Sequence, residues 1–249
     1  MKERLAANEE IVTDVIIAEE SNKEKEVLSK GAEMLLPALF KNVERLHAIS
    51  TESNEEMDVE NDEAASEPAP LQPTADSTQR ITQAIASLAG LAPTSFLQKL
   101  FKKLMKRLLE ESQNENEVKD KLCSLLNLSQ ALVASEALDE ASVMLLYRTM
   151  KPMIRSDEHG PKAQKLAYKV LAEICNCHHA FMTESSTMKE LVDLLTGTAL
   201  TSQVSARGMR LKCMSILVDG FEEGSLNDSV RIILTYCDKI IFPFLFYSY

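Results

Sequence analysis

Along most of the chain, apolar side chains recur every three or four residues, the spacing that places them on one side of an α-helix. Residues 161–178 show this most clearly. Their apolar positions follow i, i+3, i+4, i+7, i+8 and i+11: Ala163, Leu166, Ala167, Val170, Leu171 and Ile174. Pro161 stands where a first-turn proline is tolerated, and the preceding Gly160 permits a turn. The pattern therefore predicts a helix over 161–178 with one buried face.

Similar stripes predict further helices, and these fall into pairs. The pairs are 79–92 with 95–111, 116–134 with 137–153, 161–178 with 186–200, and 204–220 with 226–241. Residues 2–20 and 24–48 are interpreted as an earlier pair, with a kink or break at Pro37. The last three pairs start near Val118, Pro161 and Val204, about 43 residues apart. A period of about 40–47 residues built from two helices is typical of HEAT and armadillo repeats.

This period predicts an all-α fold, an α-solenoid of antiparallel helix pairs. No single pair covers its own apolar face, so each pair is stabilised by stacking on its neighbours. Glycine is scarce, with 7 residues in 249, and this argues against a β-rich fold and against phosphate-cradling loops, both of which need glycine. A compact helical bundle is the main alternative.

One segment departs from the helical pattern. Residues 50–78 hold nine Asp and Glu, three Pro and no Lys or Arg. The chain as a whole has a net charge of −11, but without this segment 27 basic residues face 29 acidic ones. The segment has too little apolar surface to offset the conformational entropy that it would lose on folding. Its composition therefore predicts a disordered linker. It is either a solvated spacer or an acidic tether that competes with nucleic acid or accepts phosphate.

The resulting domain organisation has four parts. They are an N-terminal helical repeat over 1–49, the acidic linker over 50–78, HEAT-like repeats over 79–241 and an apolar tail over 242–249.

The helix predicted over 95–111 carries a row of cations. Lys99, Lys102, Lys103 and Lys106 follow i, i+3, i+4 and i+7, with Arg107 beside them. The apolar stripe of this helix comprises Phe96, Leu97, Leu100, Phe101, Leu104, Leu108 and Leu109. Cations gathered on one face attract RNA phosphates or an acidic partner. A solvated helix face and a membrane-surface helix are the alternatives.

A second set of cations lies near the starts of two predicted repeats. It comprises Lys162, Lys165, Lys169, Arg207, Arg210 and Lys212. Because the first helices of stacked repeats line one surface, these side chains would form a basic ridge along the solenoid. The alternative is a set of unrelated surface charges.

The sequence does not predict catalysis. The motifs G-x-S-x-G, G-x-x-x-x-G-K-[ST] and H-E-x-x-H do not occur. The run Cys175-Asn176-Cys177-His178-His179 has C-x-C spacing rather than the C-x₂₋₄-C of structural zinc sites, and Cys175 continues an apolar stripe. We therefore expect no enzyme activity, no metal, no cofactor and no small-molecule substrate.

Two further features of the sequence indicate where in the cell the protein is located. The first residues lack the apolar core of a secretory signal, and the five cysteines are odd in number and scattered. Both features favour a reduced intracellular protein. The longest apolar run, 240–247, is too short to cross a bilayer, so no membrane association is expected.

Several stretches resemble a known family in the same order. They are KGAEMLLPALFKNVERL, IASLAGLAPTSFLQKLFKKLMKRLLE, the run from DKLCSLLNLSQALVASEALDE to PKAQKLAYKVLAEIC, and RLKCMSILV. Together, over roughly 28–220, they resemble the ribosomal RNA-processing protein 12 family of NUC173-domain HEAT-repeat proteins. Members of that family are far longer, so the resemblance implies a fragment, a short isoform or a partial gene model. The apolar end, which includes Phe242 and Phe244, also lacks the polar face of a terminal repeat.

The resemblance implies a non-enzymatic factor of the nucleus and nucleolus. Proteins of this family act in pre-rRNA processing, in maturation of small-subunit precursors and in nuclear export, and they bind RNA and pre-ribosomal proteins. The expected partners are therefore pre-ribosomal RNA and proteins. The alternative is a nuclear transport adaptor, or another protein-binding solenoid, that has no direct RNA contact.

Overall fold

The computed structural model describes residues 22–45, 75–113, 119–156, 158–198 and 202–219, and within these ranges helices are joined by turns and no strand occurs. The helices are a stretch over 22–45, α2 (Ala75–Ala89), α3 (Thr94–Gln113), α4 (Lys119–Ala134), α5 (Glu140–Arg155), α6 (Gly160–Cys177), α7 (His179–Thr183), α8 (Ser185–Gly197) and α9 (Val204–Asp219). The predicted all-α class is confirmed. The predicted helices 2–20 and 226–241, most of the acidic linker and the apolar tail lie outside the described residues.

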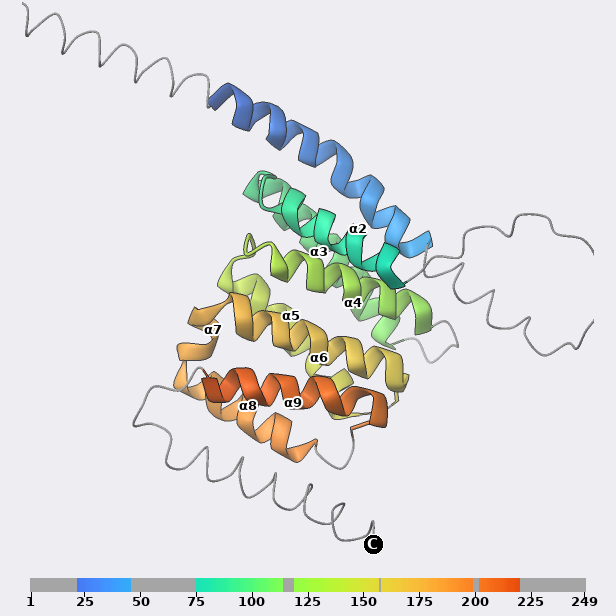
Figure 1. The fold of residues 1–249 in the computed structure, drawn as a ribbon, viewed down its shortest axis with the longest axis vertical. Helices are drawn as coiled ribbons and strands as arrows, with labels where there is room; N and C mark the ends of the chain where they lie inside the picture. The colour runs from blue at the N-terminus through green and yellow to red at the C-terminus, as the bar shows by residue number, and fades with distance from the viewer. Residues whose placement is uncertain (1–21, 46–74, 114–118, 157, 199–201, 220–249) are drawn as a thin grey trace, which may run out of the picture.

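The helices form two layers, which Figure 1 shows one behind the other. The front layer consists of α2, α4, α6 and α9, and each of these helices packs against the next. The rear layer consists of α3, α5, α7 and α8, which also contact one another in chain order. The stretch 22–45 lies at one end of the stack (Figure 1). Each layer therefore presents one long surface built from helices far apart in sequence.

The pairing of helices differs from the sequence prediction. Among successive long helices, the close contacts join α3 to α4, α5 to α6 and α8 to α9. The prediction that 116–134 pairs with 137–153, and 161–178 with 186–200, is therefore wrong by one helix. The turns on both sides of a helix such as α5 are short, so turn length does not reveal which neighbour packs more closely.

Side-chain hydrogen bonds repeat at the predicted period. Gln130 Nε2 donates to Glu173 Oε2 at 3.4 Å, and these residues are 43 positions apart. Tyr147 Oη donates to Glu190 Oε1 at 3.0 Å, again across 43 positions. These bonds join α4 to α6 and α5 to α8, so positions about one period apart lie side by side.

The core runs through the stack between the two layers. Five of the six apolar residues predicted for 161–178 are buried, and Leu166 is half-buried. On α3 the side chains of Leu97, Phe101, Leu104 and Leu108 are buried as predicted. Leu109, in contrast, is 42% exposed. One residue turns a helix by about 100°, so Leu109 lies well away from Leu108, and the buried Met105 completes the stripe.

Three further features of the helices differ from the prediction. α2 begins at Ala75, inside the segment predicted as linker. The helix over 22–45 continues through Pro37, whose exposed position places the ring away from the core. The five residues of α7 form a short helix that the sequence pattern did not predict.

Candidate functional site

The four lysines of α3 form an exposed basic face. Burial of the apolar stripe turns Lys99, Lys102, Lys103 and Lys106 towards solvent, and all four are exposed. Lys99, Lys102 and Lys103 make no ion pair with another described residue. Lys106 Nζ lies 3.8 Å from Glu110 Oε1, but both side chains are more than half exposed, so this pair is weak. The four ammonium groups therefore remain accessible to a ligand.

Arg107 has a different role from its neighbours. Its Nη1 donates to Glu44 Oε1 at 2.5 Å, and this hydrogen bond raises the pKa of the guanidinium. Glu44 belongs to the stretch 22–45, so the ion pair links that helix to α3. The structure thus separates Arg107 from the lysines with which it was predicted to act.

At its N-terminal half, the basic face approaches the start of α5. Asp139 caps α5 by accepting from the backbone N–H of Ser142 at 2.8 Å. Hydrogen bonds from Ser142, with smaller effects from Gln98 and the charge of Lys102, lower the pKa of this carboxyl. One acidic group therefore borders the lysines on this side.

Within the second set of cations, Arg210 differs from the other five because it is buried. Lys162, Lys165, Arg207 and Lys212 are exposed and Lys169 is half-buried. Arg210 is only 2% exposed, and its Nη1 donates to the carbonyl oxygen of Leu195 at 2.7 Å. That carbonyl lies in the last turn of α8, where helix carbonyls need an outside donor. The prediction that Arg210 contributes to a surface ridge is wrong.

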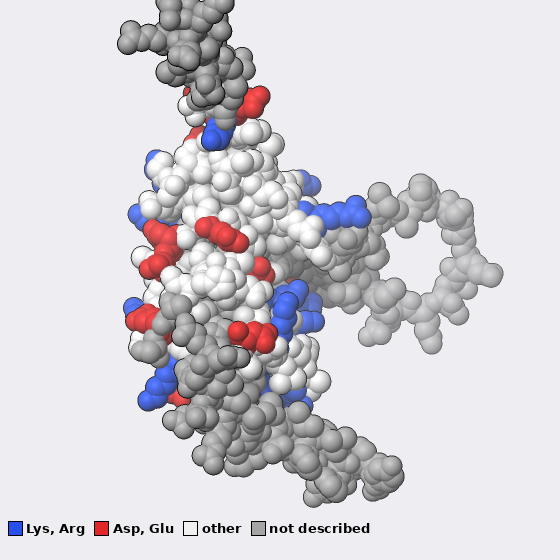
Figure 2. All heavy atoms as spheres, turned by 60° about the vertical axis from the view of Figure 1, so that its left-hand side comes forward, with Lys and Arg blue, Asp and Glu red and all other residues white. Residues whose placement is uncertain are grey.

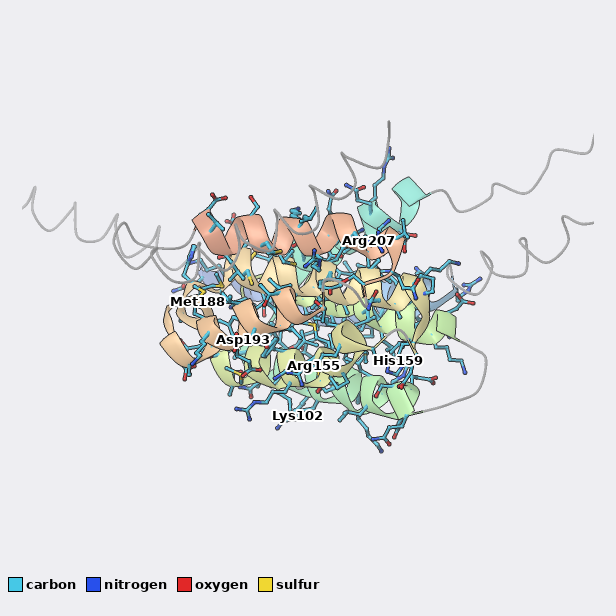
Figure 3. All side chains as sticks on the ribbon, turned by 90° about the horizontal axis from the view of Figure 1, so that it is seen from below. Lys102, Arg155, His159, Met188, Asp193 and Arg207 are labelled. Atoms are coloured by element: carbon cyan, nitrogen blue, oxygen red, sulfur yellow. The ribbon has the colours of Figure 1, made fainter. Side chains whose placement is uncertain are left out.

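The two basic sets lie on opposite layers. α3 belongs to the rear layer, whereas α6 and α9 belong to the front layer. Figure 3 places Lys102 and Arg207 on opposite sides of the stack. The face shown in Figure 2 carries both basic and acidic side chains rather than one continuous basic field. The α3 lysines and the second set of cations therefore lie on two separate surfaces.

The described helices are basic overall. They carry 23 Lys and Arg against 17 Asp and Glu, a net charge of +6, although the whole chain has −11. The remaining segments therefore carry the excess of negative charge. An estimate from whole-chain charge would misjudge which ligands the helices attract.

The front layer contains a groove of about 540 Å³. Four helices contribute to it, and its lining comprises Thr78, Gln79, Thr82, Gln83 and Ala86 of α2, Asn127, Gln130 and Ala134 of α4, Lys169, Ala172 and Glu173 of α6, and Met209 and Lys212 of α9. Lys169 and Lys212 thus meet at one site, as two members of the second predicted set. The amide residues of the groove could not be predicted from the sequence, because exposed Gln and Asn are ordinary on any helix surface.

A buried polar cluster fixes α9 against α6 and so positions one wall of the groove. Tyr168 Oη donates to Thr198 Oγ1 at 2.9 Å and lies 3.0 Å from Ser202 Oγ. The backbone N–H of Gln203 donates to Gln164 Oε1 at 2.8 Å. Tyr168 and Gln164 on α6 therefore hold the connection that leads into α9.

The cysteines of the described helices are thiols at neutral pH. Burial raises the pKa of Cys123 to about 11 and that of Cys175 to about 12. Burial, with the charge of Glu173, raises the pKa of Cys177 to about 11. A nucleophile or metal ligand needs the thiolate, so these side chains act as small apolar groups.

Among the residues that the structure describes, no three His, Cys, Asp or Glu side chains gather in a way that suits a metal ion. No helix in those ranges combines the length and apolar character needed to cross a bilayer.

Comparison with known proteins gives a distant, partial similarity. No family model matches the chain. The RRP12-like protein of Homo sapiens is 26% identical over 140 residues, which are 55% of this chain and 10% of that protein. The RRP12-like protein of Gallus gallus is 34% identical over 93 residues, 36% of this chain and 7% of that protein. The chain thus spans about a tenth or less of the relatives it matches, and the resemblance seen in the sequence is confirmed at this level.

Proposed function

We propose that the chain is a HEAT-repeat α-solenoid that acts as a non-enzymatic scaffold in ribosome biogenesis. Its partners would be pre-ribosomal RNA and proteins in the nucleolus and nucleus, during pre-rRNA processing, small-subunit maturation and export. The partial similarity to RRP12-like proteins supports the biological setting. The two-layered stack, with hydrogen bonds repeating across 43 residues, supports the repeat architecture.

The observation that carries RNA binding is the exposed lysine face of α3. Lys99, Lys102, Lys103 and Lys106 point to solvent from a helix whose other side is packed in the core. Lysine ammonium groups displace the counterions of a phosphate backbone, which gives salt-dependent binding with little sequence preference. Arg107 is left out of this contact because it already pairs with Glu44.

The stack supports a scaffold role because it holds its surfaces rigidly. Leu108 on α3 and Leu126 on α4 are fully buried, and α3 and α4 pack against each other and against further helices of the stack. A lysine row on such a helix keeps its spacing when RNA binds, so less conformational entropy is lost on association.

The experiment reverses the four lysines of α3 to Glu in the full chain. A matched control reverses Lys23, Lys25, Lys41 and Arg45, four exposed cations of the stretch 22–45, so both variants change the net charge equally. Fluorescence anisotropy with a labelled single-stranded RNA then measures the two affinities at the same low salt concentration. We expect the α3 variant to bind at least about tenfold more weakly and the control to change less than about threefold.

Equal weakening by the two variants would show that only overall charge matters, and would refute the assigned face. A pull-down from nuclear extract with and without nuclease separates the alternative function. Loss of ribosomal precursors after nuclease treatment supports RNA contact. Full retention supports a protein-binding adaptor instead.

A further inference from the structure

We propose that the groove of the front layer binds an extended, acidic peptide segment of a partner protein. The groove lies on the opposite layer from the α3 lysines, so this proposal does not depend on RNA binding there. It rests on the shape of the groove, the hydrogen-bonding groups of its lining and the balance of its charges.

The shape of the groove suits an extended chain. Its lining comes from α2, α4, α6 and α9, which succeed one another across the layer. Packed helix axes are about 8–10 Å apart, so four helices span roughly 27 Å. An extended peptide advances about 3.3 Å per residue and crosses this distance with about eight residues. Small side chains in the lining, such as Ala86 and Ala172, leave room beside it.

The lining offers partners for a peptide backbone. Gln79 and Gln83 are exposed and stand one helical turn apart on α2, and Gln130 lies opposite on α4. A glutamine amide both donates and accepts, which matches the alternating N–H and C=O groups of an extended chain. The hydrogen bond from Gln130 to Glu173 is long, at 3.4 Å, and therefore weak. Little hydrogen-bond energy is lost when the Gln130 amide turns to a ligand instead.

The charges favour acidic side chains on the peptide. Lys169 and Lys212 enter the groove from α6 and α9, against the single carboxylate of Glu173. Lys162 and Lys165 continue the row of Lys169 along α6, at i−7 and i−4. Lys169 is half-buried, so its charge is less screened by solvent than that of a fully exposed lysine.

The same lining disfavours RNA as the occupant. Grooves for single-stranded nucleic acid use aromatic side chains on which bases stack, and none of the lining residues is aromatic. The α3 face and the groove are thus suited to different ligands, one to phosphates and the other to a peptide.

The test uses a fluorescein-labelled nonapeptide of alternating Glu and Ala, with two control peptides. In one control Gln replaces Glu, and in the other alternate backbone nitrogens are methylated. The protein is the full chain in two versions: unchanged, and with the eight acidic residues of 46–74 replaced by Gln or Asn so that they cannot compete. The groove variant is Lys169→Glu with Lys212→Glu, and its matched control is Lys99→Glu with Lys103→Glu. Circular dichroism checks that each variant is folded.

We expect saturable binding of the Glu peptide by at least one version of the chain, with both control peptides at least about fivefold weaker. The groove variant should weaken binding at least about tenfold, and the α3 control less than about threefold. The double variant Gln83→Ala with Gln130→Ala should weaken the Glu peptide several-fold without any change in charge.

Absence of binding by both versions would overturn the proposal. So would equal losses in the groove variant and the α3 control, or undiminished binding of the Gln peptide. An RNA titration completes the test. If the groove variant lowers RNA affinity as much as it lowers peptide affinity, the groove is a nucleic-acid site and the peptide assignment is wrong.

Discussion

Substitution of Tyr168 by Phe tests how α6 holds the connection from α8 to α9. Tyr168 is fully buried, and its hydroxyl contacts Thr198 Oγ1 at 2.9 Å and Ser202 Oγ at 3.0 Å. The substitution keeps the ring and removes both contacts. Thr198 Oγ1 still donates to the carbonyl of Leu194, and Ser202 Oγ still donates to the carbonyl of Thr198. Because Thr198 and Ser202 use their own hydroxyl hydrogens on these carbonyls, the single hydroxyl hydrogen of Tyr168 makes one hydrogen bond, to Thr198 Oγ1. This bond is buried and no solvent replaces it, so we expect the free energy of unfolding to fall by about 1–1.5 kcal/mol.

Tyr147 provides a matched control for this substitution. Its ring is also buried, at 1% exposure, and its hydroxyl likewise donates one hydrogen bond, to Glu190. Glu190 is partly exposed and keeps Lys151 and solvent as partners after the substitution. Tyr147→Phe should therefore cost about 0.5 kcal/mol, less than Tyr168→Phe.

The assay is urea unfolding followed by circular dichroism, with the change in free energy taken from the midpoint and the slope. Equal costs for the two substitutions would show that the cluster around Tyr168 is not fully formed. A change of less than about 0.5 kcal/mol for Tyr168→Phe would refute the reasoning.

Three further predictions concern stability, pH dependence and reactivity. Leu108→Ala should lower the free energy of unfolding by about 2–5 kcal/mol, because this side chain is buried. Leu109→Ala, at a position 42% exposed, should lower it by less than about 1 kcal/mol. Equal costs in urea unfolding would contradict the burial of the α3 stripe. Asp139→Ala should cost about 1 kcal/mol at neutral pH by removing the cap of α5. Hydrogen bonding from Ser142 lowers the pKa of this carboxyl from its ordinary 3.8. The stabilisation that the carboxylate gives the folded state is therefore present above pH 3.8 and is lost as pH falls through the lowered pKa. An unchanged cost of Asp139→Ala in unfolding measurements at lower pH would contradict this pH dependence. In a Cys237→Ser background, Cys177 should react with a thiol reagent fastest among the described cysteines. In the folded protein this reaction should still be roughly 100-fold slower than in urea, because the pKa of Cys177 is raised from 9.0 to about 11. A rate equal to that in urea would contradict the raised pKa.

The helices and their buried faces could be predicted from the sequence because both follow from local periodicity. The stripe from Ala163 to Ile174 predicts α6 within one residue at each end. The period of about 43 residues predicts which positions meet, as the bond between Gln130 and Glu173 shows. Periodicity carries this information because a helix with one apolar face has few ways to bury it.

Features that depend on tertiary contacts could not be predicted in the same way. Arg210 belongs to a basic helix pattern, but the carbonyl that it satisfies is on α8, 15 residues earlier. The lysines of α3 and α6 have similar spacing, yet they lie on opposite layers because alternate helices enter alternate layers. The groove likewise depends on which helices stack, so its amides have no local signature.

If phosphates bind the lysine face of α3, as we propose, RNA affinity depends on salt through Lys99, Lys102, Lys103 and Lys106. Affinity for a labelled single-stranded RNA is measured over a series of salt concentrations for the unchanged chain and for the variant with Lys99, Lys102, Lys103 and Lys106 replaced by Glu. Each phosphate contact contributes about −0.7 to the slope of log K against log salt concentration. We expect the slope to become shallower by about 3 in the variant. An equal slope in both proteins would show that these lysines make no phosphate contacts.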